Sequence, residues 1–425
     1  MRPFALTAVL CLAGVACSGE EGSGSTHGWV ARVDTVGDTI RVHTVSGSVW
    51  EGEGALVEEN SIGQLEGDEV YLLGRVVALA VDPQDRVYVL DQQGPSLRLY
   101  DGDGTFLREV GRAGQGPGEL RSPDSGLQIL TDGRVVVRDP GNARLQVFDS
   151  EGRPLATWSL RGGFNTSEPL VADTADHLFT PTIRDLGVPL DQWERGMAEY
   201  GPTGDSLGFR RHPLPPHQTP FIEAKTEDSW SRNTVPFSPQ QMYVLDRFGN
   251  YVHGIADALR FDVLHRDGSV LRVSKAYEPV PVSEGERTAR EQVATRNLRS
   301  VDPSWTWDGP PIPDVKPAYQ GLVVSDEGDV WVLLHGPGRD TGEPAYEAAA
   351  GEARAPNRWT EPNLFEVFDR EGRYLGRVPA PDRLRMNPRP VIRAGRLWAV
   401  VTDELDVQHV VRFRLVLPGS GAPVA

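Results

Sequence analysis

The side chains best suited to chemistry in this sequence are histidines, carboxylates and tryptophans, and no familiar catalytic motif joins them. His177, His253 and His335 follow successive apolar segments, and imidazole nitrogens are good zinc ligands. The sequence has no nucleophile elbow, phosphate-binding loop, dinucleotide-binding fingerprint or HExxH helix. Its two cysteines, Cys11 and Cys17, precede the body of the chain, which excludes thiol catalysis, cysteine metal sites and iron–sulfur chemistry there. The elements that position the remaining candidates therefore have to be found first.

One structural unit is complete between residues 116 and 155. Three β-rich runs, residues 126–130, 134–138 and 144–149, are separated by clusters of Gly, Pro, Asp and Asn, and residues 153–160 supply a fourth run. Four short strands with tight connections predict an antiparallel meander, which is the unit of a propeller blade.

The signal for the second strand of this unit occurs six times. It consists of an apolar run, a turn residue and a triplet of β-branched or aromatic residues. The turn residues are Asp85, Gly133, Asp176, Gly249, Gly328 and Gly395. The first two intervals, 48 and 43 residues, match propeller repeats, and the longer intervals fit one repeat plus an insertion. A second echo marks the end of the third strand, as RLYDGDG, QVFDSEG, VLHRDG and EVFDREG. The sequence therefore predicts an all-β fold, a single six-bladed β-propeller.

The GPGEL loop, the apolar-Asp-turn-VYV pattern, NARLQVFD and the D-x-E-G turn resemble NHL repeats. The whole chain resembles the six-bladed NHL-like propellers that are anchored to bacterial membranes. The match is close over the first two blades, partial over the fifth and thin over the others.

The resemblance also suggests metal ligands, although no cofactor is evident. Some NHL-like lyases bind a metal through histidines at the central pocket, and related propeller lactonases use a Glu/Asn/Asp shell. This makes Glu119, Asn142 and His335 weak candidates for a zinc or calcium ion. The alternative is structural: the three histidines stand at different offsets from their turn residues, and Asp139 recurs as Asp91, which favours a turn-holding role.

The N-terminus predicts export and anchoring. Residues 1–16 carry one basic residue and then an uncharged apolar run, as in a signal peptide. The segment AGVAC resembles a bacterial lipoprotein box, which implies cleavage before Cys17 and lipidation of its thiol; a plain signal peptidase site is the alternative. Ser18 in that family's sorting pattern favours the outer membrane. Residues 17–28 are then a lipidated cysteine and a flexible Gly/Ser-rich tether.

The remaining boundaries follow from the repeats. Residues 29–54 predict an N-terminal β-hairpin, residues 55–417 the propeller, and residues 418–425 a C-terminal tail. Residues 55–62 align with a fourth strand before any blade has begun. We expect this strand to close the ring by joining the three C-terminal strands in the last blade.

Four long insertions fall at second-to-third or fourth-to-first connections, which leave a meander from the same end. They predict one looped face with tight turns on the other, and a short helix to about Leu298 whose cap is Ser283. Their tryptophans are candidate ligand-binding residues, with packing of the loops as the alternative. The WTWDGPP turn is expected to present two of these rings. The five are Trp193, Trp230, Trp305, Trp307 and Trp359.

The formal net charge of −17, without a basic cluster, argues against a nucleic acid or an anionic lipid surface as partner. Contact with the membrane would come through the lipid anchor only, and a monomer is expected. The sequence favours a non-enzymatic recognition propeller whose looped face binds a peptide, glycan or protein. A metal-dependent lyase or lactonase with an ion at the mouth of the central channel is the alternative, and a purely structural role is also open.

Overall fold

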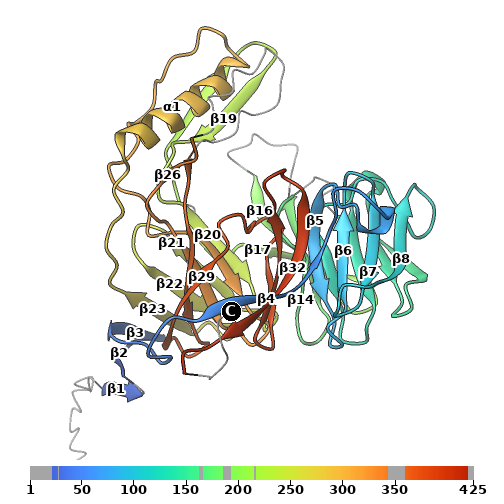
Figure 1. The fold of residues 1–425 in the computed structure, drawn as a ribbon, viewed down its shortest axis with the longest axis horizontal. Coiled ribbons are helices and arrows are strands. Elements are labelled where there is room, and N and C mark those ends of the chain that lie inside the picture. The colour runs from blue at the N-terminus through green and yellow to red at the C-terminus, as the bar shows by residue number, and fades with distance from the viewer. Residues whose placement is uncertain are drawn as a thin grey trace, which may run out of the picture.

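The computed structural model describes residues 22–26, 28–161, 166–184, 193–214, 217–342 and 359–419. Within them, six four-stranded antiparallel blades stand around a central axis (Figure 1). Blade one consists of β5 (Val76–Val81), β6 (Val87–Asp91), β7 (Ser96–Tyr100) and β8 (Phe106–Ala113). Blade two consists of β10 (Leu127–Ile129), β11 (Val135–Asp139), β12 (Arg144–Phe148) and β13 (Pro154–Ser159). Blade three consists of β14 (Val171–Ala172), β15 (Leu178–Arg184), β16 (Glu194–Tyr200) and β17 (Ser206–Arg211).

The last three blades complete the ring. Blade four consists of β20 (Gln241–Leu245), β21 (Tyr251–Ile255), β22 (Arg260–Leu264) and β23 (Val270–Lys275). Blade five consists of β24 (Tyr319–Val324), β25 (Val330–Leu334), β28 (Asn363–Phe368) and β29 (Tyr374–Ala380). Blade six consists of β30 (Val391–Arg393), β31 (Arg396–Thr402), β32 (Gln408–Val416) and β4 (Ala55–Ile62). The six-bladed fold and its closure by the N-terminal strand are thus confirmed, with Val410 opposite Ile62 and Val416 opposite Ala55.

Local backbone chemistry explains why the turn signal recurs. All six turn residues adopt a left-handed backbone, with φ between 60° and 98°, which glycine accepts without strain and aspartate tolerates. The carboxylates of Asp82, Asp173 and Asp246 each accept two backbone N–H groups of the turn that follows. These aspartates therefore hold the turns between the first and second strands of their blades.

The N-terminal segment forms a belt along three blades. The predicted hairpin consists of β2 (Trp29–Val36) and β3 (Thr39–Ser46). The strand β3 pairs in parallel with β23 and so extends blade four. The strand β1 (Gly22–Thr26), which lies inside the predicted tether, pairs with β2. The chain then runs along blade five, where Val49 and Trp50 donate backbone hydrogen bonds to Tyr374 and Leu375. It enters blade six as β4, so one continuous segment ties the last three blades together.

Most of the core lies between neighbouring blades. Where the ring closes, Ile62 and Trp398 of blade six pack with Val76 and Val87 of blade one. Between blades three and four the apolar cluster is small, with Phe179, Met197, Leu245 and Tyr251 as its buried members among the described residues. That gap is instead shared with polar side chains of the candidate site.

The described parts of the insertions gather at one side, at the top of Figure 1. We use the name cap for residues 217–237 and 276–317. The cap contains the hairpin β18 (Phe221–Lys225) and β19 (Trp230–Thr234) and the helix α1 (Glu284–Arg299), which begins after Ser283 as predicted. A small sheet, β26 (Arg339–Asp340) and β27 (Trp359–Thr360), lies on the same side; the strands β9 (Glu119–Leu120) and β8 pair in parallel beside blade one.

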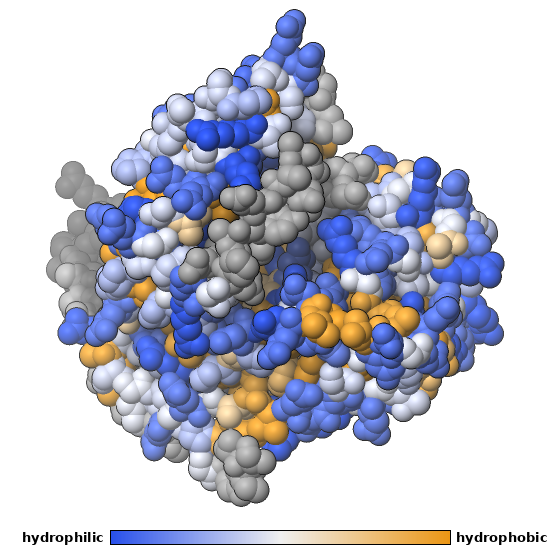
Figure 2. Space-filling model, turned by 45° about the horizontal axis from the view of Figure 1, so that its top comes forward, coloured by the Kyte–Doolittle hydropathy of each residue, from blue (hydrophilic) through white to orange (hydrophobic). Residues whose placement is uncertain are grey.

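The cap has a core of its own, which joins Ile222 and Ala224 of the hairpin to Ala294 and Leu298 of the helix. Figure 2 shows the cap standing above the disc with a mostly hydrophilic outer surface. Among the described residues, no helix is long and apolar enough to cross a membrane. Cys17 and the predicted signal peptide lie outside the described residues.

Candidate functional site

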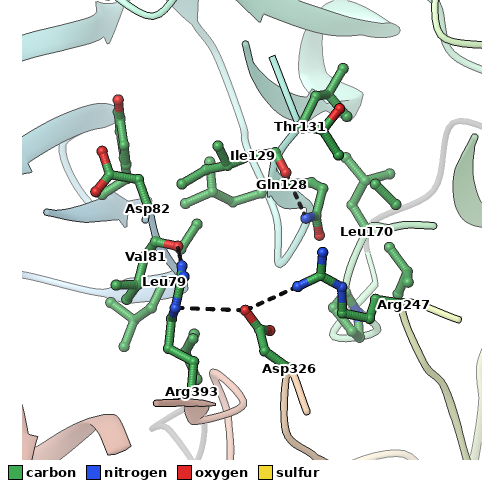
Figure 3. A pocket seen from close by; sticks show the side chains of 18 of the residues that line it. Leu79, Val81, Asp82, Gln128, Ile129, Thr131, Leu170, Arg247, Asp326 and Arg393 are labelled. Atoms are coloured by element: carbon green, nitrogen blue, oxygen red, sulfur yellow. Dashed lines mark hydrogen bonds and ion pairs between the residues drawn. The ribbon is translucent and has the colours of Figure 1, made fainter. Parts of the chain in front are cut away.

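A cavity of about 690 Å³ occupies the centre of the ring. Its wall comes from the first strand of every blade, and Figure 3 shows several of the apolar side chains that form it, among them Leu79, Ile129 and Leu170. Turn residues such as Gln84, Asp132 and Arg247 also line it, so the cavity reaches the face with the tight turns. A cavity of this size falls in the range of small-molecule sites.

An ion-pair bridge crosses the mouth of this cavity. Asp326 of blade five lies between Arg247 of blade four, at 3.5 Å, and Arg393 of blade six, at 3.7 Å (Figure 3). Arg393 also donates to the carbonyl oxygen of Val81 in blade one at 3.0 Å. These contacts connect blade four to blade five, blade five to blade six, and blade six to blade one. The charged side chains that make them are therefore already paired with each other.

A further group of side chains contains one lining residue, Arg389, and two residues that do not line the cavity, Glu168 and Tyr243. Arg389, half-buried, stands two residues before the first strand of blade six. Tyr243 of β20 donates to Oε2 of Glu168 at 2.5 Å. Burial and the Glu168 charge raise the pKa of Tyr243, so this phenol keeps its proton. Burial lowers the pKa of Arg389, while Glu168 and Tyr243 oppose that shift.

His212 packs edge-on against Tyr243, with ring centroids 4.0 Å apart, and also contacts the ring of Tyr251. Burial, followed by the nearby His253, lowers the pKa of His212 to about 4, so its imidazole is neutral at physiological pH. Its Nε2 and the hydroxyl of Tyr251 are buried without a hydrogen-bond partner in the described residues. These groups account for the polar character of the gap between blades three and four.

The side chains of the predicted Glu/Asn/Asp metal shell make hydrogen bonds within their own loops. Oε2 of Glu119 accepts the backbone N–H groups of Gln115 and Gly116, and its Oε1 faces Arg112. Asp139 accepts the backbone N–H groups of the connector before blade two and also the side-chain amide of Asn142. Asp91 takes the same place in blade one, so the oxygens of Asp91 and Asp139 hold loops.

His335 lies beneath the cap, in blade five, three blades away from Glu119 and Asn142. Its Nδ1 is 2.9 Å from Oε2 of Glu361. Oε1 of Glu361 is 3.2 Å from Lys316 Nζ, which also pairs with Glu286 of α1 at 2.8 Å. Within the described part of the chain no cluster of three or more His, Cys, Asp or Glu side chains could hold a metal ion. Zinc or calcium binding by these residues stays a prediction.

The five tryptophans occupy different environments. Trp305 is 6% exposed and donates from its indole to the carbonyl oxygen of Glu223, so its ring is part of the cap core and is not presented to solvent. Trp307 is half-buried beside it, and Trp193 and Trp359 are also half-buried. Trp230 is 46% exposed. The ligand-binding role of the five stays a prediction, with Trp230 the best placed of them.

No family model matches this chain, and no curated protein matches it. Solved structures with the same fold include a DUF4221-family protein from Bacteroides vulgatus (10% identity, 86% of this chain and 99% of that chain, TM-score 0.47). A candidate exported protein from Bacteroides fragilis has 10% identity over 89% of this chain and 99% of that chain, with a TM-score of 0.46. Virginiamycin B lyase from Staphylococcus aureus has 10% identity over 86% of this chain and 100% of that chain, with a TM-score of 0.40. At these identities the similarity concerns the fold alone.

Sequence reasoning missed Arg389, Glu168 and Tyr243. They come from three blades and share no repeat position, so no periodic signal groups them. The available signal was weak: Arg389 is a charged residue between two prolines, immediately before an inner strand.

Proposed function

We propose that the protein is a non-enzymatic recognition module of the bacterial envelope, anchored through a lipid on Cys17, with a peptide, glycan or protein ligand bound on the looped face. The observation that carries this proposal is the amphipathic hairpin β18–β19. Its inner side chains, Ile222 and Ala224, are buried in the cap core. Its outer face carries Phe221, Arg232 and Trp230 toward solvent.

The outer face is built from stacked groups. The Arg232 guanidinium lies 3.7 Å from the ring centroid of Phe221 and 5.3 Å from that of Trp230. Phe221 is 43% exposed and Trp230 is 46% exposed, while Glu223 pairs with Arg232 at 3.3 Å. Exposed aromatic rings held by an arginine are frequent in recognition surfaces, because they offer large contact areas at little cost in conformational entropy. The cap core beneath keeps this surface rigid.

Export and anchoring rest on the leader and the lipoprotein box alone. They are tested by labelling cells with a radioactive fatty acid. The wild-type protein should incorporate label and sediment with the outer membrane, whereas Cys17→Ala should do neither. Label-free wild-type protein would contradict the anchor and leave the recognition surface untouched.

The alternative, a metal-dependent lyase or lactonase, would need free ligand oxygens at the mouth of the channel. There the carboxylates of Asp82, Asp173 and Asp246 already accept turn amides, and Asp326 is paired with two arginines. Elemental analysis of the tag-free protein tests this alternative, because a stoichiometric metal would favour it over the recognition module.

The recognition surface is tested with the Cys17→Ala protein on arrays of peptides and envelope glycans. Phe221→Ala with Trp230→Ala should reduce binding at least tenfold, because both rings leave the surface. Leu155→Ala is the matched control: this side chain is 57% exposed, but it lies on the outer strand of blade two. Ligands that bind the double variant as tightly as the wild type would refute a site on this hairpin.

A further inference from the structure

The central cavity is lined by four arginines that differ in their pairing. Three have carboxylate partners: Arg86 pairs with Asp82 at 2.6 Å, and Arg247 and Arg393 share Asp326. Arg389 makes no hydrogen bond or ion pair with any residue in the described part of the chain. It is therefore the lining arginine whose donors are free for something that enters the cavity.

The carboxylate of Glu168 influences Arg389 but does not pair with it. Glu168 is close enough to influence the guanidinium charge, yet its Oε2 accepts the Tyr243 hydroxyl at 2.5 Å and no ion pair with Arg389 forms. A half-buried, unpaired cation costs free energy because the guanidinium loses part of its water without gaining a partner. Binding of an anion would supply the missing partner.

The surroundings of Arg389 indicate what kind of anion fits. The wall is mixed: each inner strand contributes apolar side chains, for example Leu127 and Val244, and the turns at the mouth add charged ones such as Asp132. One guanidinium offers a planar pair of donors that matches a carboxylate. A doubly charged phosphate would be repelled by Glu168 more strongly than a single charge, and the other arginines in the described lining are already paired. The site thus favours a single negative charge on a largely apolar molecule.

We propose that Arg389 binds the carboxylate of a small amphiphilic acid whose apolar body lies along the inner strands of the cavity. This site lies in the channel, away from the cap surface, and it does not depend on the proposed recognition by the hairpin.

The test compares octanoate with 1-octanol by isothermal titration calorimetry of the Cys17→Ala protein. The two probes differ only in the charged end. We expect saturable binding of octanoate to the wild-type cavity, at least tenfold tighter than binding of octanol. Arg389→Met should remove this preference, and Arg389→Lys should retain part of it because the charge stays but the planar donor pair is lost.

Two controls separate this claim from others. Arg153→Met changes an exposed arginine outside the cavity that pairs with Asp149, and it should bind octanoate like the wild type. The variant Phe221→Ala with Trp230→Ala should also bind octanoate normally, whatever it does to array ligands. Wild-type protein that fails to bind octanoate, that binds both probes equally, or that keeps its preference after Arg389→Met would overturn the proposal.

Discussion

The base of the cap and the central cavity each hold a positive charge that is at least half-buried, but the two charges differ in their partners. At the base of the cap, Lys316 has a fully buried side chain between Glu286 and Glu361, and it also donates to the carbonyl oxygen of Gly336. Arg389 lines the cavity without an ion-pair partner among the described residues, and the carboxylate that influences it, Glu168, accepts a hydrogen bond from Tyr243. The comparison indicates that a buried cation paired with carboxylates, such as Lys316, stabilises the fold, whereas an unpaired cation such as Arg389 is available to bind a ligand.

The largest effect is expected at the base of the cap. Lys316→Met would leave Glu286 buried without its cation and Glu361 with His335 as its remaining side-chain partner, which should cost about 3–5 kcal/mol of unfolding free energy. Urea unfolding measures this loss. In Lys275→Met, the matched control, Glu366 keeps its second partner, Arg377, so a smaller loss is expected. Equal losses in both variants would show that pairing does not decide the cost.

The next effect concerns the cap core. Trp305→Ala should cost about 3 kcal/mol, since it empties a buried site beside Leu298. Trp230→Ala should change stability by no more than about 0.5 kcal/mol, since that ring is exposed. Hydrogen exchange of α1 shows whether the loss is confined to the cap. Equal losses of stability in Trp305→Ala and Trp230→Ala would contradict the conclusion that Trp305 packs in the cap core while Trp230 is exposed.

Asp329 offers a smaller, pH-dependent test of what an unpaired charge costs. Burial, with help from Asp369, Glu327 and Glu371, raises the pKa of its carboxyl to about 6. The folded protein therefore keeps a proton that the unfolded chain loses near pH 4, so the free energy of unfolding falls as the pH rises from about 4 to 6. Asp329→Asn should be more stable than the wild type by about 2 kcal/mol at pH 7.

Near pH 4 the two proteins should unfold at the same urea concentration, because the wild-type carboxyl is then protonated in the folded state. A stability difference that does not change between pH 4 and pH 7 would exclude titration of this group as the cause.

Much of the fold could be predicted because its signals are local. A left-handed turn needs glycine or aspartate, and an aspartate that accepts turn amides must stand at a fixed distance from it, so Asp82, Gly133 and Gly249 marked the blades. The fourth-strand character of residues 55–62 likewise required a partner in the last blade. The side of the disc that bears the cap followed from strand order alone.

The remaining features depend on contacts between distant segments. Nothing in residues 39–46 indicates parallel pairing with blade four, because a strand has no sequence signal for its partner. The WTWDGPP turn could bury or present its rings, and the cap core decides that Trp305 is buried. Arg389 is distinguished by the lack of a partner among the described residues. The sequence cannot show this lack, because the residues around Arg389 come from other blades.

The most direct test of this account replaces two shielded arginines with the same residue. Arg138 in blade two is fully buried and paired with Asp124, whereas Arg389 is half-buried and lines the cavity without a partner in the part of the chain that the structure describes. Thermal melts of ligand-free protein should show that Arg138→Met lowers the melting temperature by several degrees, because Asp124 loses its cation. Arg389→Met should raise it by about 1–3 °C, because an uncompensated charge is removed. A melting temperature lowered by Arg389→Met would mean that this arginine stabilises the fold, and would contradict the account.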